Sequence, residues 1–282
     1  MFEVVAKSFK ANVAINCDFI SFSHINAMLL MDQKKTGNSP LSTTATYTGI
    51  FEEIRGLYAQ ESKAKELSLK KADFSFNSKK HTCKACKGMG KTKVSLDFLS
   101  DVWVNCDSCG GKRYDNTILG ITFKGNSIAQ LLDKSISQIK ELFKEHASIH
   151  HQLQVLEDVG IGYLSLGQST SSLSGGETQR LKLAKELMKN SPEKTLYIFD
   201  EPSIGLHFQD LEKLIAVFKK LAQAGHSVVL IEHHLQLIQN SDYLIDLGPH
   251  GGEKGGEVLF QGKTEDIKQC SNSYTAKALR GS

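Results

Sequence analysis

The chain has 282 residues, of which 40% are hydrophobic and 23% charged, a composition typical of globular proteins with a sizeable core and about two structural units. Lys and Arg exceed Asp and Glu by 34 to 31, and a net charge of +3 is too small to indicate a partner. No apolar run approaches about 18 residues and no signal-peptide pattern opens the chain, so we expect neither a membrane span nor secretion.

The N-terminal part of the chain predicts a strand, a loop and a helix. The run "INAMLLMDQ" favours a buried strand ending at Asp32 and Gln33. Residues 34–49 are rich in Ser, Thr and Gly, which indicates an exposed loop. Apolar residues at helical spacing predict a helix from Ile50 to about Ala59, followed by a charged connection over residues 63–71.

Four of the six cysteines predict a zinc site. Cys83-x-x-Cys86 and Cys106-x-x-Cys109 are separated by 19 residues, within the range of tetrahedral zinc sites, and each pair lies on a glycine turn. Short strands, "KVSLDFL" and "DVWVNC", are expected between the pairs. Without a secretory signal this spacing favours metal over disulfides and indicates the reducing cytoplasm. Four thiolates leave no open coordination position, so the zinc is expected to be structural.

A basic run overlaps the cysteine pairs. Six lysines and one histidine lie between Lys79 and Lys93, with no acidic residue. Such a run is often only a solvated surface, but a rigid zinc module with lysines can also follow a nucleic-acid backbone. Trp103 then has two interpretations, stacking on a base or filling a buried strand position.

Helices are expected over residues 127–133, 135–145 and 147–158, and a further one follows "SSLSGG". Ser174, Gly175 and Gly176 precede its apolar face, which includes Leu181 and Ala184. Unpaired N–H groups at such a start can hold a phosphate. The P-loop pattern G-x-x-x-x-G-K-[ST] is absent from the sequence, since "GMGKT" and "QGKT" both lack the first glycine.

The C-terminal part predicts a parallel α/β sheet. "TLYIFDEP", "SVVLIEHH" and "DYLIDLGP" are apolar strands separated by helical segments, and "GGEVLFQG" resembles an edge element. At the carboxyl ends of the first two strands, Asp200 can hold Mg²⁺ and Glu201 can polarise an attacking water. Either His233 or His234 is placed to touch a γ-phosphate.

These motifs together resemble the ABC ATPases. "LSGGE", "TLYIFDEP", "GLH" and "IEHH" are similar to the signature motif, Walker B motif, D-loop and switch histidine of that family. With "ATYTG", "CKACKGMG", "CGGKRY" and "DLGPHGGEKGGEV" in order, residues 25–277 resemble the C-terminal half of the UvrA family of bacterial nucleotide excision repair.

The resemblance implies roles for individual residues. Gln33 would be the Q-loop glutamine, and Ser174, Gly175 and Gly176 would cap the γ-phosphate of an ATP held by an opposing P-loop. Asp200 and Glu201 would form the Walker B pair, and His233 would be the switch histidine. The implied cofactors are structural zinc and ATP with Mg²⁺. Candidate DNA-phosphate contacts are Lys84, Lys87, Lys91, Lys93 and Arg113.

The resemblance also implies a domain division and partners. We expect an ATP-binding remnant over 1–72, a zinc-binding module over 73–120, a helical signature subdomain over 121–172 and an ABC ATPase core over 173–282. Damaged double-stranded DNA and a UvrA-type dimer partner would be bound in the cytoplasm, as part of the SOS response. The P-loop, the first ATPase domain and the UvrB-binding segment of the family would lie upstream, so we expect the chain alone to hydrolyse ATP poorly.

Three alternatives remain open from the sequence. A UvrA paralogue for resistance to DNA-binding antibiotics would carry the same motifs, and so would a non-catalytic DNA-binding remnant. The pattern C-x-x-C-x-G-x-G at residues 83–90 also resembles the zinc knuckles of DnaJ-type co-chaperones. That family uses several such repeats and a His-Pro-Asp tripeptide, which this sequence lacks.

Overall fold

The computed structural model describes residues 7, 9, 22, 24–34, 39, 41–96, 99–189, 193–250 and 256–281, with only the backbone at 95, 96 and 99–101. The chain divides into two compact units. The first comprises Met1–Met31 and Glu193–Ser282, and the second Asp32–Pro192. The expected four-part division stays a prediction. Among the described helices, none has the length and hydropathy needed to cross a bilayer.

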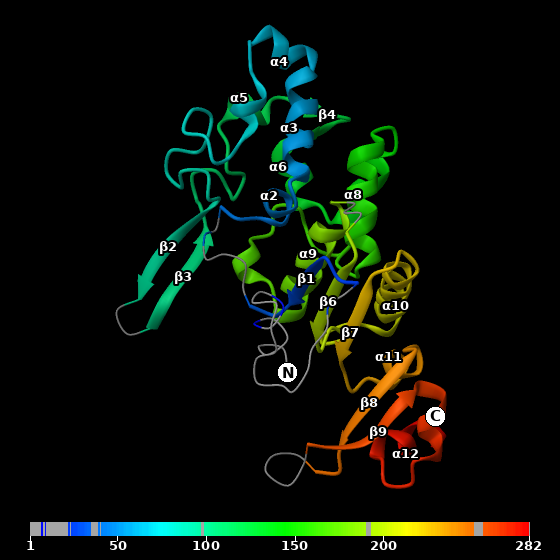
Figure 1. The fold of residues 1–282 in the computed structure, drawn as a ribbon. Helices are drawn as coiled ribbons and strands as arrows, with labels where there is room; N and C mark the ends of the chain where they lie inside the picture. The colour runs from blue at the N-terminus through cyan, green and yellow to red at the C-terminus, as the bar shows by residue number, and fades with distance from the viewer. Residues whose placement is uncertain are drawn as a thin grey trace. The chain divides into compact units, whose positions relative to one another are not determined.

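The first unit contains a parallel sheet of β1 (Ala27–Met31), β6 (Thr195–Asp200) and β7 (Ser227–Ile231), in the order β1-β6-β7 (Figure 1). The central strand β6 is buried along its length except at Asp200, which explains its uninterrupted apolar sequence. Helix α10 (Phe208–Gln223) packs on the sheet through Phe218, whose ring lies 4.8 Å from that of Phe199. The predicted α/β class is confirmed here.

A second sheet in the same unit departs from the prediction. β8 (Tyr243–Gly248), within "DYLIDLGP", pairs antiparallel with β9 (Glu257–Lys263) instead of joining the parallel sheet. Its residues alternate between exposed and half-buried, the period-two pattern of a strand with one covered face. The covered face includes Leu244, which packs on a core formed by α11 (Leu235–Gln239), η5 (Thr264–Gln269) and α12 (Tyr274–Gly281).

The second unit begins with short helices where a loop and a charged connection were expected. These are α2 (Thr44–Thr48) and α4 (Ser62–Glu66), on either side of the predicted helix α3 (Ile50–Gln60). A capping box between Thr43 and Thr46 starts α2. Gly49, with φ of 91°, separates α2 from α3, a conformation that favours glycine.

Most of the rest of the second unit consists of helices and a pair of short strands around aromatic side chains. These elements are η1 (Lys71–Phe74), α5 (Asn116–Leu119), β4 (Thr122–Phe123), β5 (Asn126–Ser127), α6 (Ile128–Asp133), α7 (Ile136–Lys140), η2 (Glu141–Phe143), α8 (Ala147–Asp158), η3 (Thr170–Ser172) and α9 (Gly175–Leu187). The helix expected over 135–145 is thus α7 followed by the 3₁₀ turn η2. Phe51 of α3 packs on Phe76 with ring centroids 5.0 Å apart, and Phe76 contacts Tyr114.

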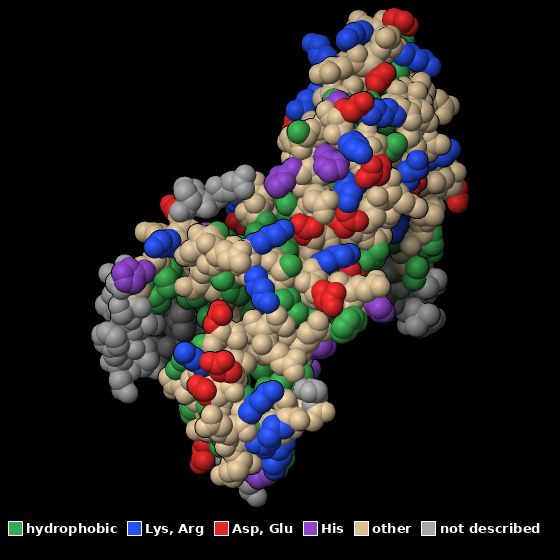
Figure 2. Space-filling view, turned by 90° about the vertical axis from the view of Figure 1, so that its right-hand side faces the viewer, with side chains coloured by type: hydrophobic (Ala, Val, Ile, Leu, Met, Phe, Trp, Pro, Cys, Tyr) green, Lys and Arg blue, Asp and Glu red, His purple; other side chains and the backbone are tan. Residues whose placement is uncertain are grey.

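A hairpin of β2 (Lys91–Leu96) and β3 (Leu99–Asn105) projects from the second unit (Figure 1). In its register Lys93 lies opposite Trp103, and Val94 lies opposite Val102. Trp103 is 41% exposed, so of its two interpretations the buried strand position is excluded. On the face drawn in Figure 2, Lys and Arg are interspersed with Asp and Glu, consistent with the small net charge.

Candidate metal centre and nucleotide-binding motifs

The four paired cysteines form one cluster in the second unit. Their Sγ atoms all lie within 4.8 Å of one another. The Cys83–Cys106 and Cys86–Cys109 Sγ distances are 3.9 and 3.7 Å, close to the roughly 3.8 Å expected of sulfurs bound tetrahedrally at about 2.3 Å from zinc. The backbone N–H of Gly90 donates to Cys86 Sγ at 3.2 Å. The donor set therefore fits a Cys₄ zinc centre.

The two halves of the cluster share one backbone geometry. After Cys86, Lys87 and Gly88 have φ of 51° and 81°, and after Cys109, Gly110 and Gly111 have φ of 56° and 83°. These successive left-handed residues turn the chain back beneath each cysteine pair. A Cβ at Gly88 would lie 1.9 Å from the carbonyl oxygen of Phe76, so only glycine fits there.

The thiols of the cluster differ in acidity. The backbone N–H of Cys109 lowers the pKa of the Cys106 thiol to about 7, whereas burial raises the pKa values of Cys86 and Cys109. Because zinc binds thiolates, its binding must release protons from the less acidic thiols. Metal affinity is therefore expected to fall at low pH.

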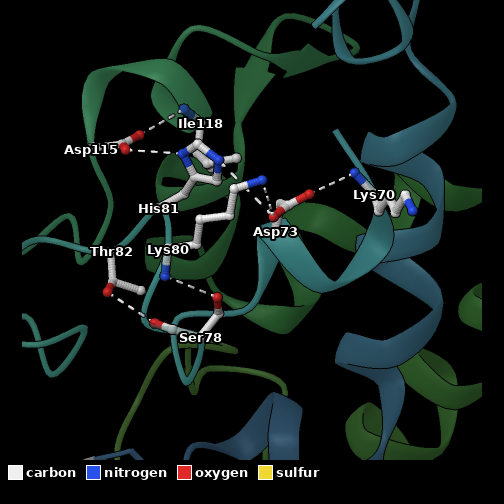
Figure 3. A network of polar contacts seen from close by, with 8 residues as sticks. All are labelled: Lys70, Asp73, Ser78, Lys80, His81, Thr82, Asp115 and Ile118. Atoms are coloured by element: carbon white, nitrogen blue, oxygen red, sulfur yellow. Dashed lines mark hydrogen bonds and ion pairs between the residues drawn. The ribbon is translucent and has the colours of Figure 1, made fainter. Parts of the chain in front are cut away.

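A polar network connects the chain segments on either side of the cysteine cluster (Figure 3). His81 Nδ1 lies 3.1 Å from Asp115 Oδ2, and its Nε2 lies 4.0 Å from Asp73 Oδ1. Asp73 accepts a hydrogen bond from the N–H of Lys70 and lies 3.4 Å from Lys80 Nζ. Burial opposes ionisation of Asp73, but these two contacts lower its pKa below the usual value. The network joins the chain before Cys83 to the chain after Cys109.

The predicted DNA contacts divide into two groups. The side chains of Lys84, Lys87, Lys91 and Lys93 are exposed around the cysteine cluster and along β2. Arg113 is half-buried instead. Its Nη2 donates to the carbonyl of Gly167 at 3.0 Å and its guanidinium lies 4.8 Å from the ring centroid of Phe76. The structure thus gives Arg113 internal contacts that link the zinc module to the segment before α9.

Helix α9 begins with a capping box that includes the predicted phosphate-binding turn. Ser174 Oγ accepts from the N–H of Glu177 at 3.3 Å, and Glu177 Oε2 accepts from the N–H of Ser174 at 2.7 Å. The Tyr163 hydroxyl donates to Glu177 Oε1 at 2.6 Å. Although burial opposes ionisation, hydrogen bonds from Tyr163 and Ser174 lower the pKa of Glu177. These hydrogen bonds therefore fix the backbone at the start of α9.

Gln33 lies directly against this helix start. A Cβ built on Gly175 would be 2.6 Å from Gln33 Oε1 and 3.0 Å from Gln33 Cβ. Lys182 of α9 fixes the residues on both sides of Gln33. Its Nζ donates to Asp32 Oδ1 at 2.5 Å and to the carbonyls of Asp32 and Lys34 at 3.1 and 2.8 Å. The structure therefore brings together Gln33, Ser174 and Gly175.

In the first unit the predicted catalytic residues meet at the carboxyl ends of β6 and β7. Asp200 ends β6 with an exposed side chain. Glu201 follows with φ of 47°, a left-handed conformation that is costly for a non-glycine residue, and its N–H donates to the carbonyl of Ile231 at 2.9 Å. Glu201 Oε1 lies 3.7 Å from Nδ1 of His233, whose side chain is exposed. His234 is the N-cap residue of α11.

Comparison with known proteins gives the family of this chain. A family model described as "ABC transporter" matches residues 54–204, more than half of the chain. The chain belongs to the ABC transporter family.

Two relatives of this ABC chain share the same name. It is 47% identical over 257 residues to "UvrABC system protein A" of Aquifex aeolicus and 43% identical over 271 residues to that of Bacillus subtilis. These matches cover 91% and 96% of the chain but only 28% of each relative. The solved structure of UvrA2 from Deinococcus radiodurans matches with a TM-score of 0.88 and 37% identity, covering 98% of this chain and 34% of that one. The resemblance inferred from the motifs is confirmed.

Sequence reasoning missed two residues of this ABC family chain whose side chains bond at or directly beside predicted site residues. Lys182 was no more than one of many helix lysines, and only the fold brings Asp32 to it. Glu232 lies within "IEHH", directly before the histidine pair, yet its carboxylate accepts hydrogen bonds from three backbone N–H groups. The position of an acid at the end of an apolar strand was the available signal.

Proposed function

We propose that the chain is part of a UvrA-type ABC ATPase that binds damaged double-stranded DNA in nucleotide excision repair. The observation that carries the proposal is the meeting of Asp200, Glu201 and His233 at the ends of two parallel strands, where such sheets bind ligands. Relatives named "UvrABC system protein A" support the assignment to this type.

The proposed site works by positioning and charge neutralisation, because phosphoryl transfer needs little covalent chemistry from the protein. Asp200 holds Mg²⁺, directly or through water. Glu201 accepts a hydrogen bond from the attacking water and orients it, and His233 contacts the γ-phosphate. The N–H groups at the Ser174–Gly176 turn, together with the dipole of α9, face a nucleotide held by an opposing P-loop.

The zinc module supplies the proposed DNA contact. Zinc held by the four cysteines keeps both turns rigid, and the exposed lysines around it neutralise backbone phosphates. Trp103, on the same hairpin face as Lys93, adds an aromatic surface on which a base can stack. Four thiolate ligands also favour a reducing compartment, and we propose the cytoplasm.

Hydrolysis is tested by placing this chain in the matching segment of the Bacillus subtilis relative, which is 43% identical. We expect the chimera to hydrolyse ATP and Glu201→Gln to lower kcat by at least about 100-fold, since general bases contribute that much. Glu212→Gln, at an exposed position of α10, is the control and should leave kcat unchanged. Undiminished hydrolysis by the Glu201→Gln chimera would overturn the assignment. If instead the isolated chain hydrolyses ATP robustly and Glu201→Gln abolishes this activity, the proposal that the site needs an opposing P-loop is overturned.

DNA binding is tested through its salt dependence. Alanine replaces Lys84, Lys87, Lys91 and Lys93 together. The slope of log K against log salt should become shallower by about 0.9 for each lysine that contacts a phosphate. The control replaces four exposed lysines of the first unit, Lys213, Lys219, Lys268 and Lys277. An unchanged slope in the first variant would count against the zinc module as the DNA contact. Arg113 is left intact because its internal contacts would confound the result.

A further inference from the structure

The Glu232 carboxylate joins two loops at the proposed catalytic site. Its Oε1 accepts a hydrogen bond from the N–H of Ser203 at 2.9 Å. Its Oε2 accepts from the N–H groups of His233 and His234 at 2.9 and 3.1 Å. Ser203 lies in the loop that follows β6, and the two histidines lie in the loop that follows β7. One side chain thereby connects the carboxyl ends of adjacent strands.

This connection acts on a loop that contains a left-handed non-glycine residue. Glu201 has a left-handed φ of 47°, which persists only where neighbouring contacts enforce it. The N–H of Glu201 is held by the carbonyl of Ile231, and the N–H of Ser203, two residues later, is held by Glu232. The two acceptors, the Ile231 carbonyl and the Glu232 carboxylate, lie at the last residue of β7 and the residue after it. They fix the turn that presents the Glu201 carboxylate 3.7 Å from His233.

We propose that Glu232 is a positioning residue for ATP hydrolysis, which holds the loop of Glu201 and the loop of His233 in one geometry. The inference rests on the proposed function of the site. The positioning role rests on both oxygens of Glu232, each of which accepts from a backbone N–H group of the two loops. Its negative charge strengthens these three hydrogen bonds relative to a neutral acceptor.

The chemistry of the side chain determines which variants are informative. Glutamine keeps the size of Glu232 but replaces one acceptor oxygen with an NH₂ group, which faces the backbone N–H groups as a second donor. Aspartate keeps both acceptor oxygens on a side chain that is one methylene shorter. Glu212→Gln makes the same chemical change at an exposed position of α10 and is the matched control.

The link is tested in the isolated chain by amide hydrogen exchange, which needs no hydrolysis. In Glu232→Gln, which keeps one acceptor oxygen, we expect the amide of Ser203 or that of His233 to exchange at least about tenfold faster, while the Ile198 amide in β6 keeps its rate. Glu232→Asp should lie between Glu232→Gln and the wild type. Glu212→Gln should match the wild type throughout. If exchange at both Ser203 and His233 is unchanged in both Glu232 variants, the proposal is overturned.

Positioning is tested by turnover in the chimera. Glu232→Gln should lower kcat at least about tenfold and leave KM within about twofold, because lost orientation acts on the transition state. Glu232→Asp should recover part of kcat, and adding Glu201→Gln to Glu232→Gln should cost little more than Glu201→Gln alone. Faster exchange with unchanged kcat overturns catalytic positioning. If Glu201→Gln leaves kcat intact, the proposed function fails, while the exchange rates still decide whether Glu232 links the loops.

Discussion

Gly175 lies where α9 comes close to the side chain of Gln33, so a side chain added at this position would displace Gln33. In Gly175→Ala the added Cβ would meet Gln33 Oε1 at 2.6 Å, so we expect the free energy of unfolding to fall by about 1–3 kcal/mol. Gly56→Ala is the matched control, since a Cβ at this position of α3 meets nothing within 4 Å. It should stabilise the chain by up to about 1 kcal/mol. Denaturant titration measures both, and equal effects of the two substitutions would contradict the close approach.

Glu177 makes the start of α9 sensitive to acid. Its folded-state pKa lies below the ordinary value of 4.5, so the ionised carboxylate stabilises the fold above pH 4.5. This contribution is lost as the pH falls below 4.5 through the folded-state pKa. Glu177→Gln should lower stability by roughly 1 kcal/mol at pH 7 and by progressively less in acid. Denaturant titrations between pH 7 and pH 3 measure the difference, and a constant difference would contradict the expectation.

At the scale of elements, the paired turns and the β2–β3 hairpin are expected to depend on metal. Cys86→Ser removes a buried ligand and should reduce bound zinc from one ion per chain to a fraction of that, as measured by atomic absorption. Cys270→Ser is the control, because Cys270 lies outside the cluster and its Sγ contacts the carbonyl of Leu259. Equal zinc content in both variants would contradict the Cys₄ centre.

The elements also indicate what a sequence can predict. β6 and α10 are marked by continuous burial and by helical periodicity, and the cysteine spacing is local, so all three were predictable. The short helices α2 and α4 were missed because caps and packing, rather than periodicity, stabilise them. The pairing of β8 with β9 and the contacts of Glu232 and Lys182 depend on segments brought together only by the fold.

At the scale of the whole molecule, the two units are expected to unfold separately. Each has its own buried residues, and the cluster of four cysteines lies in the second unit. Calorimetry should show two transitions. A chelator should lower the midpoint temperature of the transition of the second unit and leave that of the first unit unchanged, because metal binding stabilises only the unit that holds the metal. A single transition that moves as a whole would contradict this division.

The left-handed backbone of Glu201 has a consequence for how this chain can be altered. Glycine adopts φ of 47° without the steric cost that a Cβ imposes, so Glu201→Gly should be more stable than Glu201→Ala by about 1–2 kcal/mol in denaturant titration. The backbone at the end of β6 is thus expected to be more stable with glycine, which has no carboxylate, than with alanine. If Glu201 has the proposed catalytic role, stability and hydrolysis make opposite demands at this position, and a related chain with glycine there is expected to fold without hydrolysing ATP.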